Sequence, residues 1–345
     1  MCDAFSGNFE LISKEFKALP DYRVNCFLSD DKFWFFGYTN GENTQMHTTY
    51  FNASSARWDK DVPRKVTLPS GASDENVSSA IFVFCTRIFL FLHTAFGMIE
   101  NAALHEFDQQ SMKWATKWNV MINLPKDLEL AKNPNRHILN LVSGEGKNGV
   151  YFIDTRSNIY HLRVPDGTIT NESSLELVGR FKANGSSFLQ EIRPSTAAFF
   201  PSSNNVEVEA NESDAGGTIV ALGGFHGCGF IYEYSILLRY RLGDGTSDIV
   251  EINGTSPPTA AGVFAHQAAF PAADLWSIFG VMTRVEMTSS QFKGSIYTLK
   301  NAAISDSPTW TKCKKKIPAD TKYIIAKHNP RELYVFRNSG VFRLK

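Results

Sequence analysis

Six short hydrophobic runs, most of them rich in aromatic residues, recur along this chain of 345 residues and constrain its fold more than any other feature. Their starting positions are separated by roughly 55 to 70 residues. A regular series of hairpins with few helical signals is typical of a toroidal all-β repeat. We therefore predict a β-propeller. The runs comprise residues 33–36, 88–92, 150–153, 219–222, 275–279 and 333–336.

Each run is interpreted as the second strand of a four-stranded antiparallel blade. Residue pairs that favour tight hairpin turns, such as Asn40-Gly41 and Ser339-Gly340, lie between or beside the expected strands. In the first blade, we expect one outer strand over residues 57–67. The prediction is six blades within a single domain, residues 1–345. Their approximate bounds are 22–70, 77–124, 135–183, 187–254, 262–318, and 321–345 together with 8–16.

The last unit contains only three expected strands before the chain ends. A strand-like segment at residues 9–12, before the first unit, can supply the fourth. Pairing of this N-terminal strand with the C-terminal blade closes the ring and removes an exposed sheet edge. This complementarity of the two ends is the main argument for six blades.

Composition bears on the class of partner. The chain has 35 Lys and Arg residues against 35 Asp and Glu, so its formal net charge is zero. A balanced chain has no global field that attracts nucleic acid or anionic lipid. The longest apolar stretch, residues 80–92, is interrupted by Arg87 and is too short to cross a bilayer. We expect neither a nucleic-acid partner nor a membrane partner.

The five cysteines are scattered and none forms a C-x-x-C pair, so neither a zinc site nor a disulfide framework is predicted. The chain opens without a basic segment followed by an apolar one, which favours the cytoplasm. Six N-glycosylation sequons, slightly more than chance predicts, favour a secreted protein if a leader has been removed. The sequons start at Asn52, Asn76, Asn171, Asn184, Asn211 and Asn253.

The fourth unit contains a strand, residues 219–224, that ends in a glycine pair and precedes Tyr232 and Tyr234. Three units carry a tryptophan near their ends, and this combination resembles kelch-type propellers. The second, third and sixth units have no glycine pair. The resemblance therefore implies the architecture and no functional residue. The three tryptophans are Trp58, Trp118 and Trp310.

Motifs that often carry chemistry have structural interpretations here. Residues 144–149 match the spacing of a dinucleotide-binding loop, but a strand pattern follows them where that mechanism needs a helix. Residues 305–310 resemble a fragment of the sialidase aspartate box without its glycine. A glycine-rich segment, residues 223–230, contains His226 and Cys228 but no identifiable supporting acid. No H-x-x-x-H pair occurs, so we expect no metal site. Since none of these motifs supports catalysis, we also expect no cofactor and no catalytic residue.

The loops of a propeller converge at one mouth, where side chains from distant positions meet. We expect the binding face to carry the loops between second and third strands and between blades. The predicted set is mildly basic, which suits an acidic peptide or an anionic glycan. We predict a monomeric scaffold that binds a protein or peptide; the alternative is a carbohydrate-binding or glycan-hydrolysing propeller, similar to a lectin or a sialidase. The predicted residues are Asn40, Arg136, Arg156, His226, Lys293 and Arg337.

Overall fold

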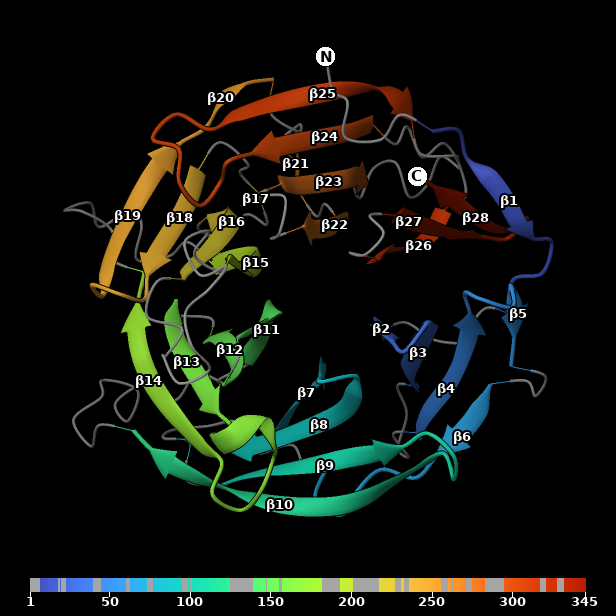
Figure 1. Cartoon of the computed structure of the whole chain (residues 1–345), viewed down its shortest axis with the longest axis vertical. Helices are drawn as coiled ribbons and strands as arrows, with labels where there is room; N and C mark the ends of the chain where they lie inside the picture. The colour runs from blue at the N-terminus through green and yellow to red at the C-terminus, as the bar shows by residue number, and fades with distance from the viewer. Residues whose placement is uncertain are drawn as a thin grey trace.

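The chain folds into a propeller-like ring of antiparallel sheets around a central axis, as the computed structural model shows (Figure 1). In each unit one edge strand lies near the central axis and the opposite edge lies on the outside of the ring (Figure 1). The all-β prediction is confirmed. The structure describes residues 7–17, 19, 23–39, 45–59, 63–72, 77–94, 99, 101–124, 139–146, 148–154, 157–181, 193–200, 217–226, 231–232, 236–255, 260–261, 264–270, 275–282, 295–316, 321–327 and 332–345.

The first sheet follows the predicted order, except at its outer edge. Residues 57–67 do not form the single strand that was expected. Two short strands in this range pair separately with β4. Pro63 lies between them and lacks the backbone N–H that a continuous ladder needs. The strands are β2 (Arg23–Ser29), β3 (Lys32–Thr39), β4 (Gln45–Asn52), β5 (Arg57–Trp58) and β6 (Arg64–Val66).

The next three units share one long hydrogen-bonded sheet. Their outer strands β10 and β14 pair in parallel, and their inner strands β11 and β15 meet at Ser143 and Ala198. Two short strands, β17 and β21, pair beside this path. The strands of the main path are β7 (Val77–Phe84), β8 (Arg87–Thr94), β9 (Ala102–Asp108), β10 (Lys113–Asn123), β11 (Leu139–Gly146), β12 (Gly149–Asp154), β13 (Asn158–Arg163), β14 (Ser174–Arg180), β15 (Arg193–Phe200), β16 (Thr218–His226), β18 (Ile236–Arg241) and β19 (Thr246–Glu251); β17 is Ile231–Tyr232 and β21 is Ala260–Ala261.

A single turn of 3-10 helix, η2 (Pro165–Gly167), lies between β13 and β14.

The fifth unit is a separate sheet whose outer edge carries the short strand β20 in parallel with β25. Its strands are β20 (Asn253–Gly254), β22 (Phe264–Phe270), β23 (Leu275–Met282), β24 (Ser295–Lys300) and β25 (Thr309–Lys316).

The two ends of the chain meet in the last sheet, as predicted. The N-terminal strand β1 pairs antiparallel with β28, and Arg343 Nη2 lies 2.8 Å from Glu10 Oε2. Gly340 has a φ of +132°, and a Cβ there would lie 2.1 Å from the Ser13 carbonyl oxygen. Only glycine fits this close approach of β1. The strands are β1 (Glu10–Ser13), β26 (Thr321–Lys327), β27 (Glu332–Arg337) and β28 (Gly340–Leu344).

Six separate blades were expected, but the described strands form four hydrogen-bonded sheets. The difference arises because hydrogen bonds at the β10–β14 and β11–β15 contacts join three units into one sheet. Each of these units is still an antiparallel meander, in which every strand pairs with the next one along the chain, apart from the insertion of β17.

Aromatic packing between neighbouring sheets explains why the hydrophobic runs are continuous. Phe33 faces the last sheet, where its ring centroid lies 4.4 Å from that of Tyr334. Trp34 faces the opposite way and lies 5.5 Å from Phe107 of β9. Both side chains are fully buried. A strand that is covered on both faces has no solvent-facing positions, so its residues do not alternate between polar and apolar.

The cysteines differ from the expectation. Cys313 in β25 is disulfide-bonded, whereas Cys26 and Cys85 are not. Burial raises the pKa of the Cys26 thiol. Sequence spacing did not reveal the disulfide, because a disulfide depends on the distance between two cysteines in the fold. In the described part of the chain, no helical segment has the length and hydrophobicity needed to span a bilayer.

Candidate ligand-binding groove

The binding set predicted from the sequence lies mostly beyond what the structure describes. Asn40, Arg136, Arg156 and Lys293 lie outside the described residues. His226 ends β16, and only its backbone is described.

Arg337 ends β27, and its guanidinium carbon lies 4.9 Å from the ring centroid of Phe342. The convergence of Arg337 with the other five residues therefore stays a prediction.

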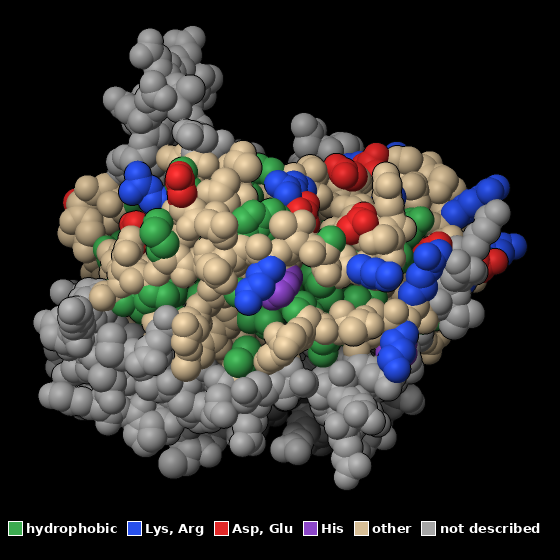
Figure 2. Space-filling model, turned by 90° about the horizontal axis from the view of Figure 1, so that it is seen from below, with side chains coloured by type: hydrophobic (Ala, Val, Ile, Leu, Met, Phe, Trp, Pro, Cys, Tyr) green, Lys and Arg blue, Asp and Glu red, His purple; other side chains and the backbone are tan. Residues whose placement is uncertain are grey.

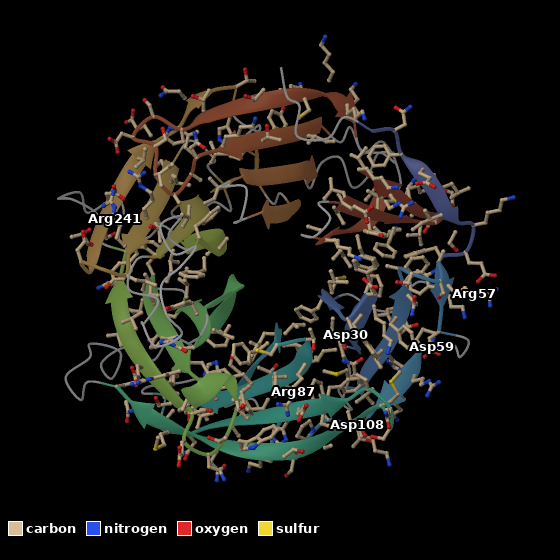
Figure 3. All side chains as sticks on the ribbon, viewed as in Figure 1. Asp30, Arg57, Asp59, Arg87, Asp108 and Arg241 are labelled. Atoms are coloured by element: carbon tan, nitrogen blue, oxygen red, sulfur yellow. The ribbon has the colours of Figure 1, made fainter. Side chains whose placement is uncertain are left out.

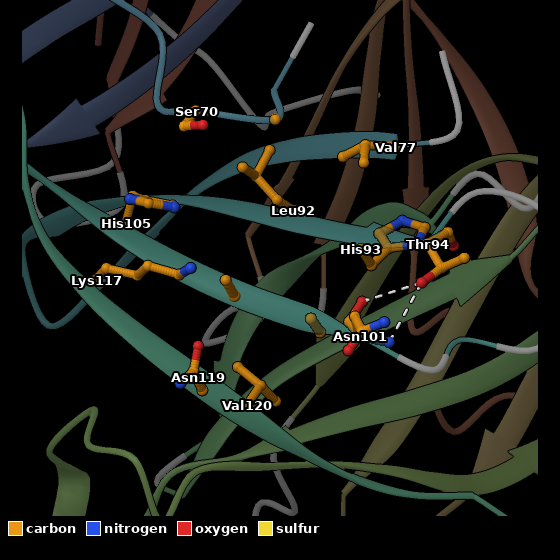
Figure 4. A pocket seen from close by; sticks show the side chains of 13 residues that line it. Ser70, Val77, Leu92, His93, Thr94, Asn101, His105, Lys117, Asn119 and Val120 are labelled. Carbon is orange, nitrogen blue, oxygen red and sulfur yellow. Dashed lines mark hydrogen bonds between the residues drawn. The ribbon is translucent and has the colours of Figure 1, made fainter. Parts of the chain in front are cut away.

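A groove opens elsewhere, beside the end of β8, which is the second strand of its unit. Its volume is about 440 Å³, and it lies over the sheet formed by β7 to β10 (Figure 4). It therefore involves the end of a second strand, the element whose loops were predicted to bind. The lining residues are Ser70, Gly71, Val77, Leu92, His93, Thr94, Asn101, Ala102, Ala103, His105, Lys117, Asn119 and Val120.

Hydrogen bonds between Thr94 and Asn101 close one end of the groove; we call this pair the polar clamp. The backbone N–H of Thr94 donates to the Asn101 carbonyl at 3.0 Å. Thr94 Oγ1 donates to the same carbonyl at 3.4 Å and accepts from the Asn101 N–H at 3.2 Å (Figure 4). These bonds fix the end of β8 against the residue that precedes β9.

His93 lies beside this clamp and is only 2% exposed. Its Nδ1 is 2.8 Å from the Thr94 carbonyl oxygen. A carbonyl can only accept, so Nδ1 carries a proton, and in the neutral ring Nε2 is the acceptor nitrogen. The ring also packs at 5.5 Å from Phe91, which fixes its orientation.

Lys117 supplies the charge of the groove and lies beside His105. They are direct partners in the register of β9 and β10, and both side chains point into the hollow (Figure 4). His105 is buried and Lys117 is exposed. Burial, and secondly the positive charge of Lys117, lower the pKa of His105. At neutral pH the pair therefore presents one ammonium beside a neutral imidazole.

Every ionisable residue in the described lining is basic, and none is a carboxylate. Leu92, Val77 and Val120 add apolar surface. Figure 2 shows the side of the ring formed by β9 and β10, where hydrophobic side chains form a middle band and charges of both signs are scattered. The groove is thus a local basic and apolar site on a surface of mixed charge.

A second hollow, of about 370 Å³, lies at the other end of the same sheet near its turns. Its charged groups already bind one another: Arg87 Nε and Nη2 each lie 2.5 Å from an oxygen of Glu106. The Arg87 guanidinium also stacks 5.3 Å from the ring centroid of Phe89. Figure 3 labels Arg87 and Asp108 at this end. We interpret this hollow as structural, because its cation has an internal partner.

The segment that resembles an aspartate box also has a structural role. Arg239 is 1% exposed, and its Nη1 donates to the Ser305 carbonyl at 2.8 Å. Its Nη2 lies 2.8 Å from Asp248 and 3.4 Å from Asp306. Burial alone would raise the pKa of Asp248, but Arg239 and Arg241 hold it below its usual value. These bonds join the turn before β25 to β18 and β19.

Within the described ranges, no three His, Cys, Asp or Glu side chains lie close enough together to hold a metal ion. Sequence reasoning missed His93, His105 and Lys117 as site residues. The alternating pattern of β9 and β10 gives a signal for the His105–Lys117 pair, but a β-bulge obscures it. The register shifts between Trp114 and Lys117, so Lys117 rather than Thr116 faces His105.

No protein-family model and no curated protein matches the chain. Among solved structures, a predicted 6-phosphogluconolactonase from Bacteroides uniformis ATCC 8492 is similar with a TM-score of 0.43 and 9% identity, over 88% of this chain and 74% of that chain. A chain of the mitotic checkpoint complex is similar with a TM-score of 0.39 and 12% identity, over 90% of this chain and 85% of that chain. Neither fold nor activity is transferred from these two proteins to this chain.

Proposed function

We propose that this chain is a six-bladed propeller that binds a protein or peptide partner, and that the groove beside β8 receives an acidic segment of that partner. The observation that carries the proposal is the composition of the groove. Its described lining combines an exposed ammonium, two histidines and apolar side chains, with no carboxylate. Such a site matches a carboxylate that is flanked by hydrophobic residues.

The blade count is supported by the unequal strength of the strand pairings. The parallel contact between β10 and β14 pairs three residues of each strand, and β11 and β15 pair at one position. Within a unit, β7 and β8 pair at eight positions. The joined sheet is therefore three blades in weak edge contact, which with the other three sheets makes six.

The kelch-type relationship stays a prediction. Gly223 and Gly224 lie in β16, the second strand of its unit, which is where the resemblance requires a glycine pair. The three tryptophans lie on the outer strands of their units. Lectin-like binding of a carbohydrate also stays a prediction. For the sialidase-like alternative, the described groove lining supplies no pair of carboxylates for glycoside hydrolysis.

A pair of synthetic peptides tests the binding proposal directly. The first alternates Glu with Leu and carries fluorescein; in the second, Lys replaces every Glu. We expect the Glu peptide to raise the fluorescence anisotropy on binding, while the Lys peptide stays unbound. The proposal fails if the two peptides bind equally well or if neither binds.

The charge reversal Lys117→Glu locates the site. It places a carboxylate where the peptide's own carboxylate must lie, so we expect affinity to fall about tenfold, or about 1.4 kcal/mol. Lys300→Glu is the matched control, because Lys300 is exposed at the end of β24, far from the groove in sequence and on another sheet. Equal loss in both variants would indicate nonspecific charge attraction.

A further inference from the structure

Two of the six sequon asparagines are both described and exposed. Asn171 lies in the turn between η2 and β14, and its sequon ends at Ser173. Asn253 begins β20, and its sequon ends at Thr255. Asn52, the third described sequon asparagine, is only half-exposed in β4. The two exposed positions lie at the outer strands of the ring, where a bulky group can extend into solvent (Figure 1).

The hydrogen bonds at both positions are compatible with a substituted side-chain amide. Asn171 uses Oδ1, which accepts from the Asn119 N–H at 3.1 Å. Asn253 donates from Nδ2 to Ser307 Oγ at 3.1 Å. A glycosylated amide nitrogen keeps one N–H, so each bond can persist after modification.

The disulfide at Cys313 is an independent indication of the compartment. When two thiols form this disulfide, two electrons and two protons pass to an oxidant, such as the disulfide of an oxidoreductase. Disulfides form and persist in the endoplasmic reticulum and outside the cell, and are rare in the cytosol. N-glycosylation takes place in the same secretory compartment.

From these observations we propose that Asn171 and Asn253 carry N-linked glycans and that the chain matures in the secretory pathway. The donor is a lipid-linked oligosaccharide pyrophosphate. A bond forms between Asn Nδ2 and the anomeric carbon, the bond from that carbon to the pyrophosphate oxygen breaks, and Nδ2 loses one proton. The lipid pyrophosphate leaves. This inference does not depend on the groove or its ligand, and it replaces the cytoplasmic expectation with the secreted alternative.

Mass spectrometry of the chain purified from its natural source tests the proposal. Peptide N-glycosidase digestion in ¹⁸O water converts a glycosylated Asn into ¹⁸O-labelled Asp. We expect this label at Asn171 and at Asn253. A label at one position supports that site and rejects the other, and unmodified asparagine at both overturns the proposal.

Alkylation of the same sample without reductant checks the compartment. Cys85 is exposed and is not part of a disulfide, so it should react, whereas Cys313 should react only after reduction. Reaction of Cys313 before reduction contradicts maturation in an oxidising compartment.

Variants secreted from eukaryotic cells provide the second test. Asn171→Gln and Thr255→Ala should each prevent the attachment of one glycan, so each variant should migrate faster on a gel by the mass of one glycan. Asn123→Gln is the control, because Asn123 is exposed at the end of β10 and is not part of a sequon. If neither variant changes mobility relative to the control, the two asparagines are not glycosylated.

Discussion

The two ends of the β7–β10 sheet are built from the same four strands but use charge differently. At the turn end, the Arg87 cation is matched by the Glu106 carboxylate on the neighbouring strand. At the groove end, Lys117 faces His105, and the described lining contains no carboxylate. The cation at the turn end has its counter-charge within the chain, and we propose that an acidic group of a partner supplies it at the groove end.

Hydrogen bonds to neighbouring units occur at both ends of the sheet. At the turn end, Gln109 Nε2 donates to Ser29 Oγ at 3.2 Å, and Ser29 Oγ in turn donates to the Thr86 carbonyl. These bonds join the first two units. At the groove end, Thr94 and Asn101 bond to each other within one unit, whereas the Asn119 N–H donates to Asn171 of the next unit, and a hollow of about 440 Å³ remains. Charge pairing, rather than bonding between units, thus distinguishes the turn end from the groove end that we propose binds a partner.

The largest expected effect removes what the two ends share. Trp34 is fully buried between the first two units, in the same hydrophobic cluster as Leu92, which lines the groove, and Phe107, which lines the other hollow. We expect Trp34→Ala to lower the free energy of unfolding by about 3–5 kcal/mol, because it deletes a large buried ring and leaves a cavity. Chemical denaturation measures the loss. A change below 1 kcal/mol would mean that this interface does not stabilise the ring.

A large side chain placed in each hollow in turn tests which of the two hollows binds the peptide. Ala103 lines the groove and Thr116 lines the other hollow. We expect Ala103→Trp to weaken binding of the Glu–Leu peptide by at least about tenfold, or about 1.4 kcal/mol, by occupying its space. Thr116→Trp should bind the peptide as the unmodified chain does. Circular dichroism must first show that both variants are folded; equal binding by the two would remove the functional distinction.

The sequence predicted the second strands well, for a physical reason. Each of the six hydrophobic runs lies within the second strand of its unit, in β3, β8, β12, β16, β23 and β27. In β3, Phe33 and Trp34 face opposite neighbouring sheets, so both faces require apolar residues. A strand that is buried on both faces appears in the sequence as a continuous apolar run. Such a run can be recognised without knowing how the strands pair.

The groove could not be predicted because it depends on register and on contacts between units. A simple hairpin with its turn at residues 109–112 pairs His105 with Thr116. The bulge between Trp114 and Lys117 shifts the pairing by one residue, which places Lys117 opposite His105. The prediction of a single outer strand in the first unit was wrong for a similar reason, since Pro63 lies between two short strands. Local irregularities of this kind change which side chains meet while leaving the hydrophobic pattern intact.

A smaller effect is expected at the turn end. Glu106→Gln removes the carboxylate that binds Arg87, a cation whose side chain is 41% exposed. Pairs this accessible to water contribute about 0–1 kcal/mol, so we expect a loss within that range that shrinks further at high salt. Peptide binding should not change. A clear loss of peptide affinity in Glu106→Gln would show that the turn end also belongs to the binding surface.

The smallest effect is the pH dependence of His105. Its folded pKa is lowered, so between that pKa and the ordinary value of about 6.5 the unfolded chain binds more protons than the folded chain. Stability from neutral His105 is therefore complete above the unfolded pKa and is lost as the pH falls through the folded pKa. Unfolding measured as the pH is lowered should show a smaller loss in His105→Gln than in the unmodified chain.

A proton NMR titration connects this pH dependence to the groove. Lys117→Met removes a positive charge beside the ring, so the pKa of His105 should rise towards its ordinary value. Saturating Glu–Leu peptide should raise it as well, because a carboxylate in the groove stabilises the imidazolium. By linkage, the peptide then binds more tightly as the pH falls. If the variant raises the pKa and the peptide does not, the ammonium and imidazole are neighbours as described, but the acidic group binds elsewhere.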